Sequence, residues 1–235
     1  MKTLLHKSED RGKAKIDWLD SHFSFSFGPY FNPRKTNFGL LRVLNDDIIS
    51  PDRGFGTHPH DNMEIISIPI YGQLKHADDT GHESVISENE IQVMSAGTGI
   101  QHSEVNPSST QEANFLQIWI FPNKRNVEPR YDQQQMPSDI KNEFYQILSP
   151  NPHDDGVWIH QRAWMYLLDT TEDTTLNYKI KGKGNGVYVF MIKGEAKISD
   201  ENLYLRDALG LWDTDNVELD VKADSRILTI EVPMY

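Results

Sequence analysis

The sequence contains no cysteine among its 235 residues. This absence excludes disulfides, thiolate metal sites, iron–sulfur clusters and cysteine nucleophiles, so histidine and carboxylate side chains are the only strong metal ligands present. The chain also lacks any run close to the roughly 20 apolar residues of a membrane span, and its start has no apolar segment typical of a secretory signal. We therefore expect a cytoplasmic protein without a membrane partner.

Positive charge is scarce, because 35 acidic side chains face only 23 basic ones and the formal net charge is −12. A surface of that sign repels phosphate backbones and anionic lipid. We therefore expect no direct contact with nucleic acid.

Helix signals are also few. Glycine and proline interrupt the chain about every ten residues, and the runs between them are rich in valine, isoleucine and aromatic residues, as in all-β proteins. Such runs lie at residues 38–44, 63–70, 84–87, 91–94, 113–121, 164–168, 174–180, 186–192, 196–198, 209–212 and 226–232. The pattern predicts an all-β fold.

The same order of signals occurs twice: a strand ending in glycine, a hairpin, an acidic turn and a further strand. This repetition predicts two stacked β-barrel or jelly-roll units rather than one large sandwich. We place the first unit at residues 1–122, a polar, proline-rich connection at 123–152, and the second unit at 153–235. Within the connection, residues 138–146 read as one short helix with Ser138 as its N-cap.

The segment from Gly54 to Glu64 carries the strongest chemical signal. His58 and His60 are two residues apart, so on a strand they project from the same face. His102 and Glu104 repeat this spacing. If the two pairs lie on neighbouring strands, three imidazoles and one carboxylate can meet at one interior point, a ligand set that suits Fe(II), Mn, Ni, Cu or Zn.

Other readings of these and neighbouring residues stay open. A His-X-His pair on a strand is also often solvated or structural. Glu64 could be a ligand, an acceptor that orients a histidine, or a surface acid, and we rank the orienting role first. The segment from His76 to Glu83 could hold a second metal, but its turn residues favour a solvated hairpin tip.

Two further segments carry weaker signals. Gly182-Lys-Gly-Asn-Gly186 resembles a phosphate loop but opens into a strand and lacks the Gly-Lys-Ser/Thr ending. The run from Phe23 to Phe27 reads as an alternating strand with its phenylalanines on the buried face. His153 and His160 are expected at the surface or between the units.

The pattern Gly…His-X-His-X3-Glu…Gly followed by Gly-X-Gly-X2-His resembles the two cupin motifs, and the surrounding residues resemble the pirin family. The segments that carry this resemblance are 18–28, 38–45, 54–60, 94–104 and 116–120. It implies a bicupin fold in which His58, His60, His102 and Glu104 hold one divalent metal, with Fe(II) expected and Mn, Ni, Cu, Co or Zn as alternatives. Glu64 is not expected to be a ligand in a pirin.

The resemblance implies that the second cupin binds no metal, since it lacks the matching histidines. It also places the N-terminal aromatic run near the mouth of the metal cavity. Several pirins resemble quercetinases, which open the heterocyclic ring of a flavonol with O2 and release carbon monoxide. Glu104 would then act as the general base toward a small aromatic, flavonol-like substrate. The alternative is a metal- or redox-sensing module that binds a protein partner. We expect a monomer.

Overall fold

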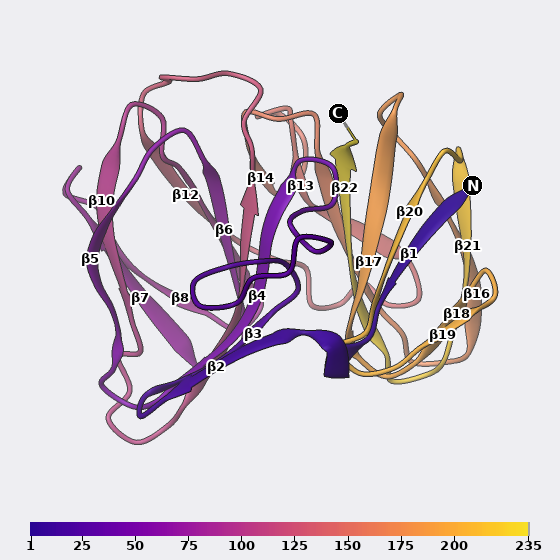
Figure 1. Ribbon diagram of the computed structural model, residues 1–235, viewed down its shortest axis with the longest axis horizontal. Coiled ribbons are helices and arrows are strands. Elements are labelled where there is room, and N and C mark those ends of the chain that lie inside the picture. The colour runs from indigo at the N-terminus through magenta and orange to yellow at the C-terminus, as the bar shows by residue number, and fades with distance from the viewer. Residues whose placement is uncertain (235) are drawn as a thin grey trace.

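The computed structural model describes residues 1–234 and consists almost entirely of β-strands, which confirms the predicted all-β fold (Figure 1). One short 3-10 helix, η1 (Ser8–Asp10), follows the first strand. Each half of the molecule is built from one seven-stranded and one four-stranded sheet, as expected for two barrel or jelly-roll units.

The first half contains the sheet β12-β9-β6-β11-β4-β3-β2 and the sheet β5-β10-β7-β8. The strands of the larger sheet are β2 (Gly12–Ile16), β3 (Leu19–Phe23), β4 (Leu41–Ile49), β6 (Glu64–Tyr71), β9 (Glu90–Ser95), β11 (Ala113–Ile120) and β12 (Arg130–Gln135). Those of the smaller sheet are β5 (Gly54–His60), β7 (Gln73–Asp78), β8 (Glu83–Ser87) and β10 (Ile100–Val105).

The second half contains the sheet β1-β20-β17-β22-β15-β13-β14 and the sheet β16-β21-β18-β19. The strands of the larger sheet are β1 (Lys2–His6), β13 (Phe144–Ser149), β14 (Val157–Trp158), β15 (Trp164–Asp169), β17 (Asn185–Lys193), β20 (Ala208–Trp212) and β22 (Arg226–Pro233). Those of the smaller sheet are β16 (Thr174–Lys179), β18 (Ala196–Ile198), β19 (Glu201–Leu203) and β21 (Asn216–Val221).

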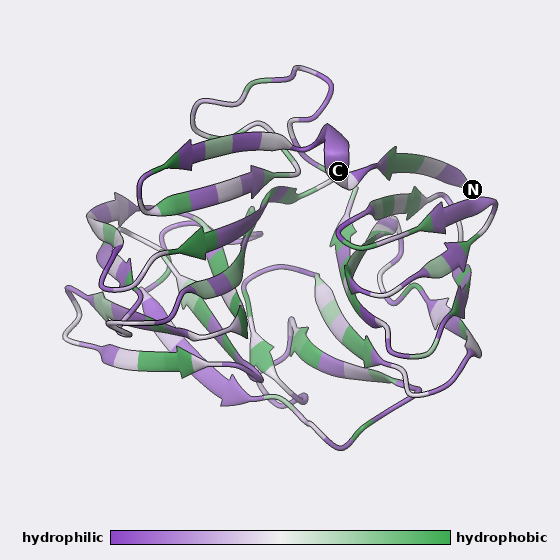
Figure 2. Cartoon of the chain, turned by 90° about the horizontal axis from the view of Figure 1, so that it is seen from below, coloured by the Kyte–Doolittle hydropathy of each residue, from purple (hydrophilic) through white to green (hydrophobic). Residues whose placement is uncertain are grey.

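The two seven-stranded sheets meet in the middle of the molecule, and the four-stranded sheets lie at its two ends (Figure 1). Hydrophobic residues alternate with hydrophilic ones along many strands, as Figure 2 shows, so these strands have one face to bury, whereas central strands such as β17 are buried on both faces. One apolar cluster joins both halves, with Leu44 and Leu116 of the first packed in the same core as Leu167 and Tyr188 of the second. This shared core fixes the two halves against each other.

The interiors of the two halves are filled differently. Fifteen buried residues form one continuous apolar cluster inside the second half. The first half has two separate clusters of four buried residues each, one around Leu74 and one around Met94. The second half is therefore filled by one apolar core. In the first half the two apolar clusters are separate, which leaves room for a site between them.

The short helix predicted over residues 138–146 is wrong. Residues 138–143 form bends, and strand β13 begins at Phe144. The reason is tertiary: Tyr145, Ile147 and Leu148 are buried in the core shared by the two halves. Their burial in a sheet outweighs the weak local signal of a cap at Ser138.

The first strand crosses to the other half of the molecule. Strand β1 pairs antiparallel with β20, from Lys2 opposite Trp212 to His6 opposite Ala208. Strand β12 joins the first sheet and β13 the second, so the chain passes between the halves at residues 136–143. The domain division at residues 122 and 152 stays a prediction. Across residues 1–234, no helix has the length and apolar character needed to cross a membrane.

Candidate metal centre

Neighbouring strands β5 and β10 bring the predicted ligands together. His58 lies opposite His102, and His60 lies opposite Ile100. Between His102 and Glu104 the register shifts, because β5 contains one residue more than β10 at this point. Gly54 makes the close approach of the two strands feasible, since a Cβ at this position would collide with the backbone of Glu104.

The three histidines converge on one point. One ligating atom from each of His58, His60 and His102 lies within 4.8 Å of the other two. The Nδ1 of His58 is 2.8 Å from the carbonyl oxygen of Gly56, which leaves Nε2 as its free ligand atom. The Nε2 of His102 is buried and has no hydrogen-bond partner within residues 1–234. Three convergent imidazoles with a buried, unpaired nitrogen fit a divalent transition metal.

The surroundings of His60 and His102 favour the neutral imidazole, which is the form that binds a metal. Burial, followed by the neighbouring His58, lowers the pKa of His60 to about 4. Burial, followed by His58 and His60, lowers the pKa of His102 to about 2. Protonation of the cluster would place several positive charges in one partly buried space, so the apo site resists it.

Glu104 lines the same cavity but does not belong to the set of converging atoms. Its Oε1 accepts a hydrogen bond from Ser67 Oγ at 2.9 Å, and its Oε2 accepts one from Gln117 Nε2 at 2.7 Å. Burial raises the pKa of this carboxyl group, against the opposing effect of the two donors. A fixed, buried carboxylate beside three imidazoles is equipped to hold a metal or a proton.

The cavity above these residues has a volume of about 380 Å³. Its walls are mostly aromatic or aliphatic: Trp18, Phe27, Phe55, Ile65 and Trp119. The ring of His60 meets that of Trp119 edge to face, with centroids 4.9 Å apart. The size and the apolar lining are those of a small-molecule site.

The aromatic run from Phe23 to Phe27 is only partly a strand, because β3 ends at Phe23. Phe25 turns into the core shared by the two halves and packs near Tyr188. Phe27 lines the metal cavity and contacts Trp119, with ring centroids 5.2 Å apart. The predicted single buried face is therefore wrong beyond Phe23, whereas the predicted position near the cavity holds for Phe27.

His76 is the residue that the sequence interpretation missed. We expected a solvated hairpin tip, but the side chain of His76 is fully buried, and its Nδ1 lies 3.4 Å from Nδ1 of His102. Its Nε2 is 2.8 Å from Asp78 Oδ2. The available signal was strand alternation, because His76 follows the buried Leu74 by two positions. His82, by contrast, is exposed and stacks on Tyr131.

In the structure of residues 1–234, no hydrogen bond joins Glu64 to His58, His60 or His102, so the predicted orienting role has no contact to support it. Glu64 is buried and accepts a hydrogen bond from Ser95 Oγ at 2.7 Å. Burial raises its pKa to about 7. His153 is exposed and His160 is half-buried, with its carbonyl oxygen accepting from the N–H of Asn123.

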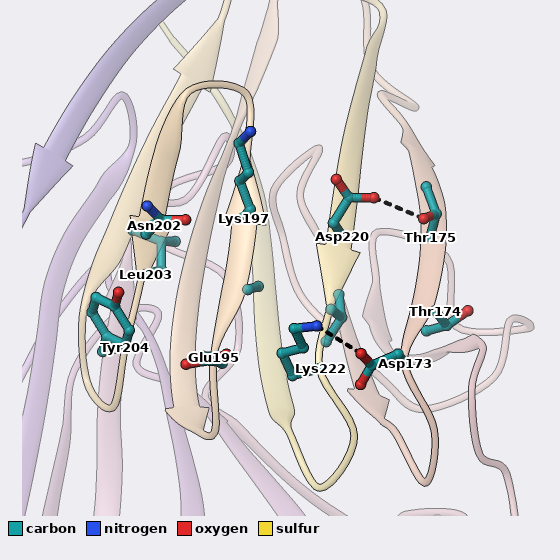
Figure 3. A pocket seen from close by; sticks show the side chains of 12 residues that line it. Asp173, Thr174, Thr175, Glu195, Lys197, Asn202, Leu203, Tyr204, Asp220 and Lys222 are labelled. Carbon is teal, nitrogen blue, oxygen red and sulfur yellow. Dashed lines mark hydrogen bonds and ion pairs between the residues drawn. The ribbon is translucent and has the colours of Figure 1, made fainter.

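The glycine-rich segment after Ile180 already holds a carboxylate of the protein itself. The N–H groups of Lys181 and Gly182 donate to Glu231, and so does Nδ2 of Asn185. A further hollow of about 510 Å³ lies over the sheet β16-β21-β18-β19 (Figure 3). Its charged side chains are exposed, and two of them, Asp173 and Lys222, form an ion pair at 2.7 Å. That the second half binds no metal stays a prediction.

Two facing sheets in each half, with three imidazoles converging inside the first, define a metal-binding protein of two cupin domains. The family model described as Pirin matches residues 5–120, and that described as the quercetinase C-terminal cupin domain matches residues 146–232. A quercetin 2,3-dioxygenase of Escherichia coli K12 is 37% identical over 229 residues, covering 97% of this chain and 98% of that protein. The chain belongs to the pirin family, as its motifs indicated.

Solved structures agree with this assignment. The bacterial pirin YhhW from Escherichia coli, described in complex with nickel(II), superposes with a TM-score of 0.94 at 35% identity, covering all of both chains. A quercetin 2,3-dioxygenase from Acinetobacter baumannii shares the fold with a TM-score of 0.78 at 22% identity, covering 99% of this chain and 78% of that one. The site therefore belongs to a protein that binds a divalent metal.

Proposed function

We propose that this protein is a dioxygenase that opens the heterocyclic ring of flavonols such as quercetin with O2 and releases carbon monoxide. The observation that carries the proposal is the convergence of His58, His60 and His102 in a cavity with aromatic walls. The names of the relatives support the same reaction.

His58, His60, His102 and Glu104 would hold the metal, and Fe(II) is the expected ion. Nickel is the first alternative, because the related structure from Escherichia coli is described with nickel(II), and Mn, Co, Cu and Zn suit the same donors. When bound, the metal supplies Lewis acidity that favours the deprotonated form of a substrate hydroxyl group.

The residues of the chain supply binding and proton transfer. Trp18, Phe55 and Trp119 offer apolar surfaces for a planar, neutral substrate and keep water from the reacting ring. Glu104 is the proposed general base for the 3-hydroxyl proton. The hydrogen bonds from Ser67 and Gln117 hold its carboxylate in the cavity before the substrate enters.

The decisive experiment combines metal analysis with an aerobic assay. The purified protein is stripped, reloaded separately with Fe(II), Ni(II), Mn(II), Co(II), Cu(II) or Zn(II), and mixed with quercetin while flavonol absorbance and carbon monoxide are followed. We expect metal-dependent loss of flavonol with release of carbon monoxide. Fully loaded protein that leaves quercetin intact with every metal would overturn the proposal. A stoichiometric protein partner captured only with the metal present would then favour the interaction module.

A further inference from the structure

Strand β4 carries two polar side chains that the metal centre does not use. Asn45 and Asp47 are two residues apart, both are buried, and both line the metal cavity. They lie on the seven-stranded sheet, whereas His58, His60 and His102 lie on the four-stranded sheet. The Asn45–Asp47 pair and the three histidines therefore occupy different walls of one cavity.

Both side chains have unused hydrogen-bonding capacity. Within residues 1–234, Oδ1 of Asn45 is buried without any hydrogen-bond partner. Asp47 has one side-chain partner, Ser21, whose hydroxyl group donates to Oδ1. A buried oxygen without a donor costs about 1–3 kcal/mol, so a ligand that supplies the donor gains binding free energy at this point.

The residue between them shows what a purely structural polar group on β4 looks like. Asp46 points to the opposite face of the strand, where its carboxylate accepts hydrogen bonds from Arg11, Arg206 and Asn114. Asp46 is fully engaged in joining parts of the protein. Asp47 has one side-chain partner, Ser21, and Oδ1 of Asn45 has none within residues 1–234, so both side chains are engaged far less than Asp46.

We propose that Asn45 and Asp47 form a subsite that binds hydroxyl groups of the substrate other than the one that meets the metal. The inference rests on the proposed function, because it assumes a flavonol-like ligand between the two walls. Oδ1 of Asn45 is an acceptor, and Asp47 accepts when its carboxyl group is ionised. Burial raises the pKa of Asp47 to about 7, so above that pH the ligand must donate to both groups. The subsite therefore selects phenols over the corresponding methyl ethers and over rings without hydroxyl groups.

The position of Asn45 connects this subsite with the reacting end. Asn45 lies directly opposite Gln117 in the pairing of β4 with β11. Gln117 holds Glu104, the proposed base. A substrate whose remote ring is fixed at Asn45 would be held in register with Glu104, so the subsite contributes to orientation as well as to affinity.

The test compares two ligands in metal-free protein and in protein loaded with Zn(II), with binding measured by quenching of tryptophan fluorescence under nitrogen. Quercetin carries hydroxyl groups on its outer rings, and 3-hydroxyflavone keeps only the 3-hydroxyl group. In the wild type we expect quercetin to bind more tightly. In Asn45→Leu we expect quercetin to bind about 10-fold more weakly, while 3-hydroxyflavone changes less than about 2-fold. Asp47→Asn should also weaken the binding of quercetin more than that of 3-hydroxyflavone, but by a smaller factor than Asn45→Leu.

Ile48→Val provides the matched control, because residue 48 neighbours Asp47 but alternates to the other face of β4. Equal losses for both ligands, unchanged binding of quercetin in both variants, or no preference for quercetin in the wild type would overturn the subsite. The two proposals fail separately. Hydroxyl-selective binding that needs Asn45, in a protein that opens no flavonol, would sustain the subsite and refute the proposed reaction.

Discussion

Nδ1 of His76 lies 3.4 Å from Nδ1 of His102, and both rings are buried. Nε2 of His76 in turn reaches Asp78 at 2.8 Å. The three residues form a continuous line from a carboxylate, through one imidazole, to an imidazole of the metal centre. If His102 carries its proton on Nδ1 and donates it to His76, its Nε2 is left free to bind a metal together with His58 and His60. A residue that accepts a hydrogen bond from the other ring nitrogen of a ligating histidine fixes its tautomer in this way.

Replacing His76 should therefore weaken metal binding without touching a ligand. His76→Phe keeps a ring in the buried space but removes the acceptor for His102 and the donor for Asp78. We expect metal affinity to fall about 10- to 100-fold, measured by competition with a chelator. His82→Phe, on the same hairpin but exposed, is the matched control and should bind normally. Unchanged metal affinity in His76→Phe would mean that His76 contributes only packing and does not act through His102.

Glu104→Gln tests the proposed base. The three histidines remain, so the variant should keep part of its metal, but the amide cannot accept the substrate proton and turnover should be lost. Ser67 can still donate to the new carbonyl oxygen, whereas Gln117 must turn its amide. Ser103→Ala serves as the control. A fully metallated Glu104→Gln that opens quercetin at the wild-type rate would show that the base lies elsewhere.

Glu64 should make stability depend on pH. Burial raises its pKa from 4.5 to about 7, so the folded protein binds this proton more tightly than the unfolded chain does. Its contribution to stability is present at low pH and is lost as the pH rises through about 7. Glu64→Gln should therefore gain stability relative to the wild type between pH 5 and pH 8, by about 2–3 kcal/mol. Urea unfolding at both pH values measures this difference.

The exposed Glu218→Gln controls for the change in net charge in that experiment. A difference between Glu64→Gln and the wild type that stays constant from pH 5 to pH 8 would mean that Glu64 does not titrate in this range.

Arg206 links the second half of the chain to strand β4. Its Nε is 2.9 Å from Asp46 Oδ2, and its Nη2 is 3.0 Å from Asn114 Oδ1. Arg206→Met would leave the mostly buried Asp46 with the more distant Arg11 and the amide of Asn114, so we expect a loss of roughly 2–4 kcal/mol in the free energy of unfolding. Lys222→Met breaks an exposed ion pair and should change stability little. Equal effects of the two substitutions in urea unfolding would contradict a structural role for the Arg206 contact.

Much of the fold and the centre of the site could be predicted because both depend on local periodicity. Alternation placed His58 and His60 on one face, and turn residues separated the strands, so the two-unit all-β architecture and the first pair of histidines followed. The family motifs added the expectation that His102 meets them across two strands. That expectation agrees with the register in which His58 lies opposite His102.

The remaining features depend on contacts that no local pattern contains. Tyr145 and Ile147 form a strand because a core built by both halves receives them. Phe25 packs in the shared core and Phe27 lines the metal cavity, although their spacing is that of one face. His76 is buried because β7 lies against β10, and turn composition alone describes only the tip of that hairpin. Glu64 is held by Ser95, a residue brought near it only by the pairing of β6 with β9.

Strand β1 has a consequence for the order in which the chain assembles. Its partner β20 is synthesised roughly 200 residues later, so β1 leaves the ribosome long before the strand with which it pairs. Contacts of such high sequence separation form slowly, because a long loop must close before they contribute. Until β1 docks, β20 presents an open edge that can pair with another chain. Strand β1 thus completes the larger sheet of the second half and covers the edge along which β20 could pair with another chain.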